Sequence, residues 1–232
     1  MYLVFEVLML ISMGGLIFVF QMDFSGWVIY LKCLSSLFFF FFGICGYIKT
    51  KQDRKIIGTM LSALFCSMAG DVFLALDKEE GVLFVLGVAS FAFAHVMFAV
   101  SFSRISSVTK GDLFGMLLIF GVEMLILCVG NFEFQGLFLV LVGYAAIISF
   151  MVIKALSLWR CRLGKERTVY LIMAGSVLFL ISDNLLLFWL FGIGIPKEIQ
   201  SASWLFYYLA QGCLSLSLSQ KFPTKKEIGQ NI

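Results

Sequence analysis

The sequence predicts an all-α fold, a polytopic bundle of about eight transmembrane helices, and three observations carry that prediction. The chain is 61% hydrophobic and only 13% charged, whereas soluble domains are about half apolar and a quarter charged. The apolar residues gather in runs of about 17 to 24 residues, the length that an α-helix needs to cross the hydrocarbon core. Lysine and arginine concentrate in alternate loops between these runs. A soluble fold of this size has no interior large enough for so much apolar surface.

The predicted spans fill nearly the whole chain, so we expect a single integral membrane domain over residues 1–232. The only two prolines, Pro196 and Pro223, lie outside the spans. The first run lacks the basic segment of a signal peptide and carries Glu6 in its first turns, so we interpret it as a retained helix. The predicted spans are 4–20, 27–48, 56–76, 81–102, 113–130, 136–158, 168–191 and 202–219.

The loop charges predict the orientation of the protein in the membrane. Lysine and arginine are retained on the cytoplasmic side, so both termini are predicted to be cytoplasmic, in the cytoplasmic membrane if the source is bacterial. The net charge is only +3, and no basic patch suggests a nucleic-acid partner. The basic loops hold Lys49, Lys51, Arg54, Lys55, Arg104, Lys110, Arg160, Arg162, Lys165, Arg167, Lys221, Lys225 and Lys226.

The cysteines and the single histidine argue against a metal site. The 6 cysteines are scattered singly without a Cys-x-x-Cys pair, and His95 is the only histidine. Zinc sites are built from clusters of these residues. We therefore expect no metal and no cofactor, and we interpret the cysteines as small apolar residues at helix contacts.

A short internal similarity suggests that the bundle consists of two parallel four-helix repeats. A small residue precedes Asp71 in the third span and Asp183 in the seventh, and each aspartate lies near the outer end of its helix. The following span then carries a polar residue near mid-membrane, either His95 or Gln211. Two halves with the same orientation would form a parallel repeat of the kind found in several membrane folds.

Ionisable side chains within the spans mark the candidate site. A charged group at mid-membrane costs on the order of 3 kcal/mol on insertion scales, and such groups usually face a functional cavity. Asp71 and Asp183 lie at matching depth, and Lys32, His95 and Gln211 accompany them. This combination favours one shared functional site over two separate structural pairs.

Other polar residues leave alternatives open. Glu123 lies mid-span, where a structural hydrogen bond and a functional role are equally compatible with the sequence. Lys154 lies near a helix end, from which its side chain is expected to reach the lipid headgroups. Tyr208 and Gln211 share one face of the last span at i, i+3 spacing. They either orient a substrate headgroup or pair between helices.

Short motifs occur in order in four of the eight spans. They are Leu31-Lys32-Cys33-Leu34; Gly70-Asp71 with Leu74, followed by Gly87, Phe91 and Ala94-His95; Ser182-Asp183-Asn184-Leu185-Leu186; and Tyr208-Leu209-Ala210-Gln211. Together these motifs resemble the lysoplasmalogenase (YhhN) family of membrane hydrolases. One departure is that the proline often found shortly after the lysine is missing, which weakens only the match in the second span.

The resemblance implies hydrolysis of lysoplasmalogens, lipids with one vinyl-ether chain and a phosphoethanolamine or phosphocholine headgroup. The products would be a fatty aldehyde and the glycerophospho-base, and the partners would be the lysophospholipid and water. Asp71 and Asp183 would be the catalytic residues. The substrate-binding residues would be Lys32, His95, Ser182, Tyr208 and Gln211.

This chemistry suits two buried carboxyl groups. Vinyl ethers hydrolyse through protonation at carbon, which gives an oxocarbenium ion that water captures. One carboxylic acid can donate the proton, because burial in apolar surroundings raises the pKa of a carboxyl group. A second, ionised carboxylate can stabilise the cation and then activate water, as in glycosidases.

Two rival functions use similar residues. A proton- or cation-coupled transporter also binds its ion with membrane carboxylates, but its spans should be interrupted near the site, where only Gly87 and Gly175 qualify. An intramembrane aspartyl protease is disfavoured because its proline-containing motif has no counterpart in any span. The headgroup preference and the oligomeric state are left open by the sequence.

Overall fold

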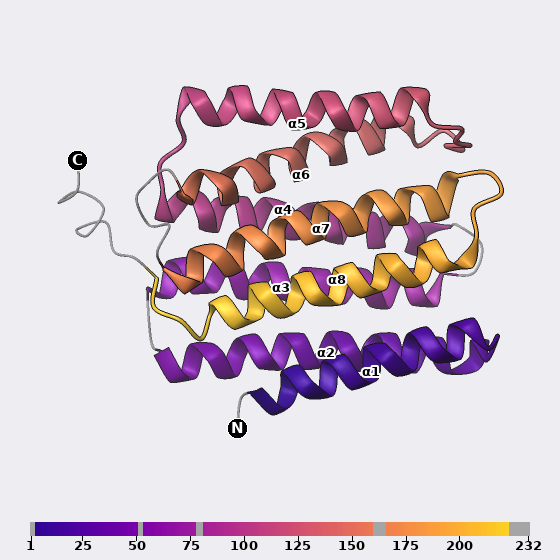
Figure 1. Cartoon of the computed structure of the whole chain (residues 1–232), viewed down its shortest axis with the longest axis horizontal. Coiled ribbons are helices and arrows are strands. Elements are labelled where there is room, and N and C mark those ends of the chain that lie inside the picture. The colour runs from indigo at the N-terminus through magenta and orange to yellow at the C-terminus, as the bar shows by residue number, and fades with distance from the viewer. Residues whose placement is uncertain (1–2, 51–52, 78–80, 160–165, 223–232) are drawn as a thin grey trace.

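The protein is an all-helical bundle, as the sequence predicts. The computed structural model describes residues 3–50, 53–77, 81–159 and 166–222. Within these residues eight α-helices run along the long axis of the molecule, and successive helices alternate in direction (Figure 1). The helices are α1 (Leu3–Gln21), α2 (Ser25–Thr50), α3 (Arg54–Leu76), α4 (Val82–Ile105), α5 (Lys110–Val129), α6 (Phe138–Leu158), α7 (Arg167–Phe191) and α8 (Lys197–Ser217).

Within the described residues, the seven helices α1 to α7 are long and apolar enough to cross a membrane, which makes this a multi-pass membrane protein. The last predicted span corresponds to α8, which is more polar and begins a turn earlier than predicted. This helix packs against α1, α2 and α7. Polar residues such as Ser203, Gln211 and Ser215 are buried along it. A helix enclosed by other helices contacts little lipid, so its outer surface need not be apolar.

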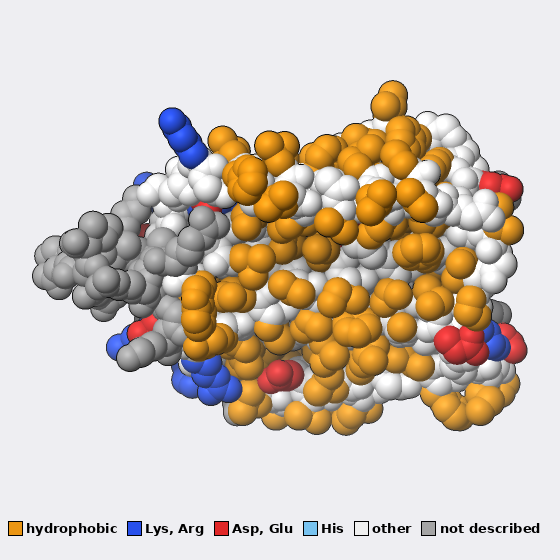
Figure 2. All heavy atoms as spheres, turned by 45° about the horizontal axis from the view of Figure 1, so that its top comes forward, with side chains coloured by type: hydrophobic (Ala, Val, Ile, Leu, Met, Phe, Trp, Pro, Cys, Tyr) orange, Lys and Arg blue, Asp and Glu red, His pale blue; other side chains and the backbone are white. Residues whose placement is uncertain are grey.

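The surface of the bundle divides into an apolar flank and two polar ends. Figure 2 shows hydrophobic side chains covering the flank, with lysine and arginine side chains mainly at one end. We call this the basic end; α2, α4, α6 and α8 end there, and α1, α3, α5 and α7 begin there (Figure 1). Exposed aromatic residues mark both ends, with Trp27 and Tyr30 at the opposite end and Trp159 and Tyr170 at the basic end. Such aromatic belts are typical of the two membrane–water interfaces.

The helix neighbours are arranged in part as two parallel repeats would arrange them. Helices α1 to α4 pack in sequence, and α5 to α8 do the same. Between the halves, α1 packs against α8; in addition, α2 packs against α8 and α4 packs against α6. If each helix is replaced by the helix four later or four earlier in the order, the contact of α2 with α8 becomes the contact of α6 with α4. The contact of α1 with α8 has no counterpart of similar extent between α5 and α4, so the duplication stays a prediction.

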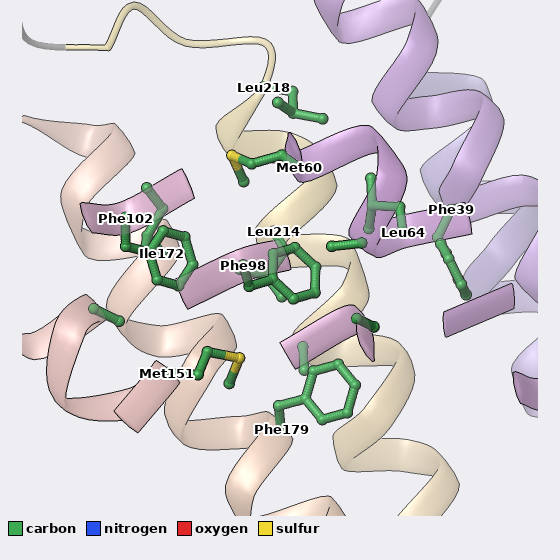
Figure 3. Close-up of a cluster of buried hydrophobic side chains, with 14 of the residues drawn as sticks. Phe39, Met60, Leu64, Phe98, Phe102, Met151, Ile172, Phe179, Leu214 and Leu218 are labelled. Carbon is green, nitrogen blue, oxygen red and sulfur yellow. The ribbon is translucent and has the colours of Figure 1, made fainter. Parts of the chain in front are cut away.

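The interior of the basic half is filled with apolar side chains. Figure 3 shows Met60, Phe98, Met151 and Ile172 converging from α3, α4, α6 and α7, and all four are essentially inaccessible to solvent. Close-packed interiors of this kind leave little room for ligands. The cavities that the two aspartates line lie nearer the opposite end.

Lys154 corrects one expectation, because its side chain does not reach the headgroups. It is fully buried. Its Nζ atom donates hydrogen bonds to the carbonyl oxygens of Ser106 and Ser107 and lies 3.1 Å from the carboxylate of Asp112. The side chain therefore ties α6 to the start of α5, and a buried cation paired in this way is structural.

Candidate functional site

Asp71, on α3, is held by one cation and two hydroxyl groups. Ser36 donates a hydrogen bond of 2.6 Å and Tyr207 one of 2.7 Å to Oδ2, while the Nζ atom of Lys32 lies 3.5 Å from Oδ1. Only 2% of the residue is exposed. A carboxyl group removed from water needs such partners. Asp71 is thus held in place through both of its oxygens.

Asp183, on α7, has partners among the described residues on one of its two carboxyl oxygens. Tyr144 donates a hydrogen bond of 2.7 Å to Oδ2, and the Nε2 atom of His95 lies 3.0 Å from the same oxygen. Among the described residues, no group donates to Oδ1. The side chain keeps 12% of its surface accessible. Asp183 therefore presents a free oxygen beside a cavity, which Asp71 does not.

The two aspartates occupy equivalent places in the two halves of the bundle. Asp71 on α3 is contacted from α2 of its own half and from α8 of the other. Asp183 on α7 is contacted from α6 of its own half and from α4 of the other. The same four-helix arrangement thus supplies both sites. Their chemical difference comes from the side chains, a lysine beside one aspartate and a histidine beside the other.

Two adjoining cavities lie beside the aspartates, and the smaller one connects them. The smaller has a volume of about 20 Å³, and both Asp71 and Asp183 line it together with Lys32, Ser182 and Tyr207. The larger has a volume of about 70 Å³ and is mostly apolar. Its polar wall consists of Glu123, Tyr144, Asp183 and Asn184. Asp183 lines both cavities and therefore lies at their junction.

An apolar groove lies outside the larger cavity, between α4 and α6. Its two sections have volumes of about 460 and 550 Å³ and share the lining residues Val96 and Ile147. Val88 and Tyr144 line both the first section and the larger cavity. The groove thus begins next to Asp183 and extends toward the basic end.

Most of the site residues predicted from the sequence come together. Lys32, Asp71, Ser182 and Asp183 line the smaller cavity. His95 does not line it but contacts Asp183 through its Nε2 atom. The hydroxyl group of Ser182 donates to a carbonyl oxygen of α8 at 3.0 Å, so it also joins two helices.

Tyr208 and Gln211 lie outside both cavities. Tyr208 is fully buried, and its hydroxyl group donates to the carbonyl oxygen of Lys32 at 3.1 Å. Gln211 is also fully buried; its amide lies near the hydroxyl group of Tyr207 but meets no hydrogen-bond geometry with any described residue. Both residues thus lie within the helix packing behind the site, and we assign them no contact with a substrate.

The sequence reasoning missed three residues that contact the aspartates directly. Ser36 shares a helix face with Lys32 at i+4 spacing, and Tyr207 shares one with Gln211, so helical periodicity contained a signal for both. Tyr144 had no such signal, because tyrosine is common near the ends of membrane spans.

Comparison with known families agrees with this arrangement. A family match extends over residues 27–218, from α2 to α8, and includes both aspartates. The chain belongs to the YhhN family. The match confirms the resemblance that the motifs in four spans indicate. No curated protein and no solved structure matches this YhhN chain significantly.

Proposed function

We propose that this YhhN protein is an intramembrane hydrolase that cleaves the vinyl-ether bond of lysoplasmalogens. The products are a fatty aldehyde and glycerophosphoethanolamine or glycerophosphocholine. The observation that carries the proposal is the shared cavity of Asp71 and Asp183, two carboxyl groups with different partners. Vinyl-ether hydrolysis requires such a difference, because one carboxyl group must give a proton while another stabilises positive charge.

The different partners of the two aspartates support a different role for each. Asp183 has a free oxygen, so it is the acid that protonates the vinyl-ether carbon. Asp71 remains ionised beside Lys32 and stabilises the oxocarbenium ion that results. Tyr144 and His95 hold Asp183 in one orientation, which keeps its acidic oxygen directed at the cavity. Preorganised charge of this kind is usually a large part of catalysis.

The surroundings of the site suit a lipid with one hydrocarbon chain. The groove between α4 and α6 begins beside Tyr144 and is lined almost entirely by apolar residues. The chain of the substrate would lie there. The glycerophospho headgroup would approach Lys32 from outside the smaller cavity, which at about 20 Å³ is too small to enclose it. The negative charge of the phosphate group and the positive charge of the Lys32 side chain would then attract each other.

The proposed orientation of the protein in the membrane follows from its basic end. Arg104, near the end of α4, and Lys110, at the start of α5, lie at the basic end, where α8 also ends at Ser217 (Figure 1). We assign that end, with both termini, to the cytoplasm. Asp71 lies only slightly more than one turn before the end of α3 at Leu76. The site then lies in the outer half of the membrane, within reach of lipids in the outer leaflet.

A transporter is the alternative, and the helices disfavour it. Transporter sites near the midplane are typically formed by interrupted helices, whereas α3, α4 and α7 continue without a break through Asp71, His95 and Asp183. Purified protein in detergent separates the two functions. A hydrolase releases aldehyde from a lysoplasmalogen without any gradient, while a transporter leaves the lipid intact and needs a sealed vesicle.

A further inference from the structure

Glu123, on α5, is a third carboxyl group at the site. It is 7% exposed and lines the larger cavity together with Asp183. The side-chain amide of Asn184 donates a hydrogen bond of 3.0 Å to its Oε1 atom. Asn184 directly follows Asp183, so this contact fixes Glu123 beside the proposed acid. A buried carboxyl group in a membrane span is costly and usually functional, yet the roles assigned so far leave Glu123 unused.

Asp71 is poorly suited to activate water. Both of its oxygens are already occupied, one by two hydroxyl donors and the other by Lys32. The cavity that it shares with Asp183 has a volume of about 20 Å³, and a single water molecule needs on the order of 10–15 Å³ by this measure. Little space is left there for both a substrate carbon and an attacking water.

Glu123 meets the requirements that Asp71 does not. The cavity it shares with Asp183 is larger, about 70 Å³, and its only hydrogen bond among the described residues comes from Asn184. The two carboxyl groups also lie within electrostatic range of each other. We propose that Glu123 is the general base that activates the hydrolytic water, while Asp71 acts only as the fixed anion. This inference rests on the proposed hydrolase function.

The division of roles gives a balanced reaction. The carboxylic acid of Asp183 gives its proton to the vinyl carbon remote from oxygen, which leaves an oxocarbenium ion and the Asp183 carboxylate. Water adds to the carbon bonded to oxygen, and its proton passes to the Glu123 carboxylate, giving a hemiacetal. The hemiacetal hydroxyl proton then goes to Asp183 as the carbon–oxygen bond to glycerol breaks, and Glu123 protonates the departing oxygen. Aldehyde and alcohol form, and both carboxyl groups return to their initial states.

The experiment compares purified wild type with Glu123→Gln on a defined lysoplasmalogen. Glutamine keeps an oxygen that accepts the hydrogen bond from Asn184 but cannot take a proton. We expect kcat to fall by about a hundredfold, the usual size of a general-base effect, with little change in KM. The pH profile should also lose the decline on its acidic side, since that decline reports protonation of the base.

A second variant covers the possibility that Glu123→Gln folds poorly. Glu123→Ala leaves a space beside Asp183, and added formate should restore its turnover at least tenfold without affecting wild type. The matched control is Glu6→Gln, which neutralises a carboxyl group on α1 that lines neither cavity. Its turnover and pH profile should equal those of wild type.

The possible outcomes separate this inference from the function on which it rests. If wild type releases aldehyde but Glu123→Gln keeps its turnover within threefold and an unchanged pH profile, the role of Glu123 is overturned alone. If Asp71→Asn then loses the decline on the acidic side, the base is Asp71. If wild type releases no aldehyde, the proposed hydrolase function fails, and the role of Glu123 fails with it.

Discussion

The hydroxyl group of Tyr207 donates a hydrogen bond of 2.7 Å to Oδ2 of Asp71. A tyrosine also donates to the other aspartate, since Tyr144 donates to Oδ2 of Asp183 at 2.7 Å. Tyr144 lies on α6, in the same half as its aspartate, whereas Tyr207 lies on α8, in the opposite half from Asp71. Each tyrosine comes from a different helix from that of its aspartate and fixes one carboxyl oxygen. The two sites differ in the remaining partner, a lysine in one and a histidine in the other. The two aspartates thus share a tyrosine donor but differ in their nitrogen partner.

The paired aspartates give the first prediction. Asp71→Asn and Asp183→Asn keep the size of the side chains but cannot ionise, so each should lower kcat by at least about a hundredfold. Because the pair acts as a unit, the double variant should be scarcely slower than the poorer single variant. Aldehyde release by purified protein measures the effect. Asp23→Asn is the control, since the Asp23 side chain is 83% exposed and lies away from the site. A well-folded Asn variant with most of its turnover would make that aspartate structural.

The ion pair of Lys32 and Asp71 gives a prediction about stability. Lys32→Met leaves the Asp71 carboxylate buried without its cation, which should lower the free energy of unfolding by about 3 kcal/mol. Adding Asp71→Asn should recover much of this loss, because the two residues are coupled. Thermal or denaturant unfolding in detergent measures both effects.

The exposed pair of Lys197 and Asp23 supplies the comparison for that experiment. The Lys197 side chain is 37% exposed, so Lys197→Met should cost about 1 kcal/mol or less. Equal losses from the two lysine variants would mean that the contact of Lys32 with Asp71 contributes no special stability.

The groove between α4 and α6 gives a prediction about the lipid chain. Gly143 lines this groove, and a Cβ atom added there would meet no other atom within 4 Å. Gly143→Trp should therefore fold normally while filling the groove. We expect kcat/KM to fall for long-chain lysoplasmalogens and to change little for short-chain analogues. Gly121→Trp on α5 is the matched control, because its added Cβ is equally free of contacts. An unchanged dependence on chain length would place the chain elsewhere.

Activity is expected to survive exhaustive treatment with EDTA or phenanthroline. Among the described residues, no group of three or more His, Cys, Asp and Glu side chains could hold a metal ion, and the proposed steps need only carboxyl groups and water. Loss of turnover that one particular metal restores would contradict this mechanism.

Much of the fold could be predicted because lipid imposes simple rules on sequence. The seven apolar helices and the positions of their ends followed from span length and loop charge. The prediction was least accurate where protein replaces lipid as the surroundings. The position of Lys154 near a helix end predicts that its side chain reaches the headgroups, but its partner is Asp112 at the start of another helix. Such a pair depends on how the helices pack, which hydropathy does not report.

The candidate site was predictable to a similar extent. Asp71 and Asp183 stood out because charge is rare inside membrane spans. Tyr207 and Tyr144 did not, since a tyrosine within an apolar run has no unusual feature until a carboxyl group is placed against it. The sequence predicted Tyr208 as a site residue, whereas its neighbour Tyr207 contacts Asp71. Adjacent residues of a helix point about 100° apart, and sequence alone does not tell which of them faces the site.

The most direct test of vinyl-ether hydrolysis follows the proton to carbon. Purified protein in D₂O would be given a lysoplasmalogen, and the released aldehyde would be trapped at once as a hydrazone for mass spectrometry. Protonation of the vinyl carbon by Asp183 predicts a single deuterium on the carbon next to the aldehyde group, at a rate that Asp183→Asn abolishes. Failure to release aldehyde, or an aldehyde without deuterium on that carbon, would contradict the account.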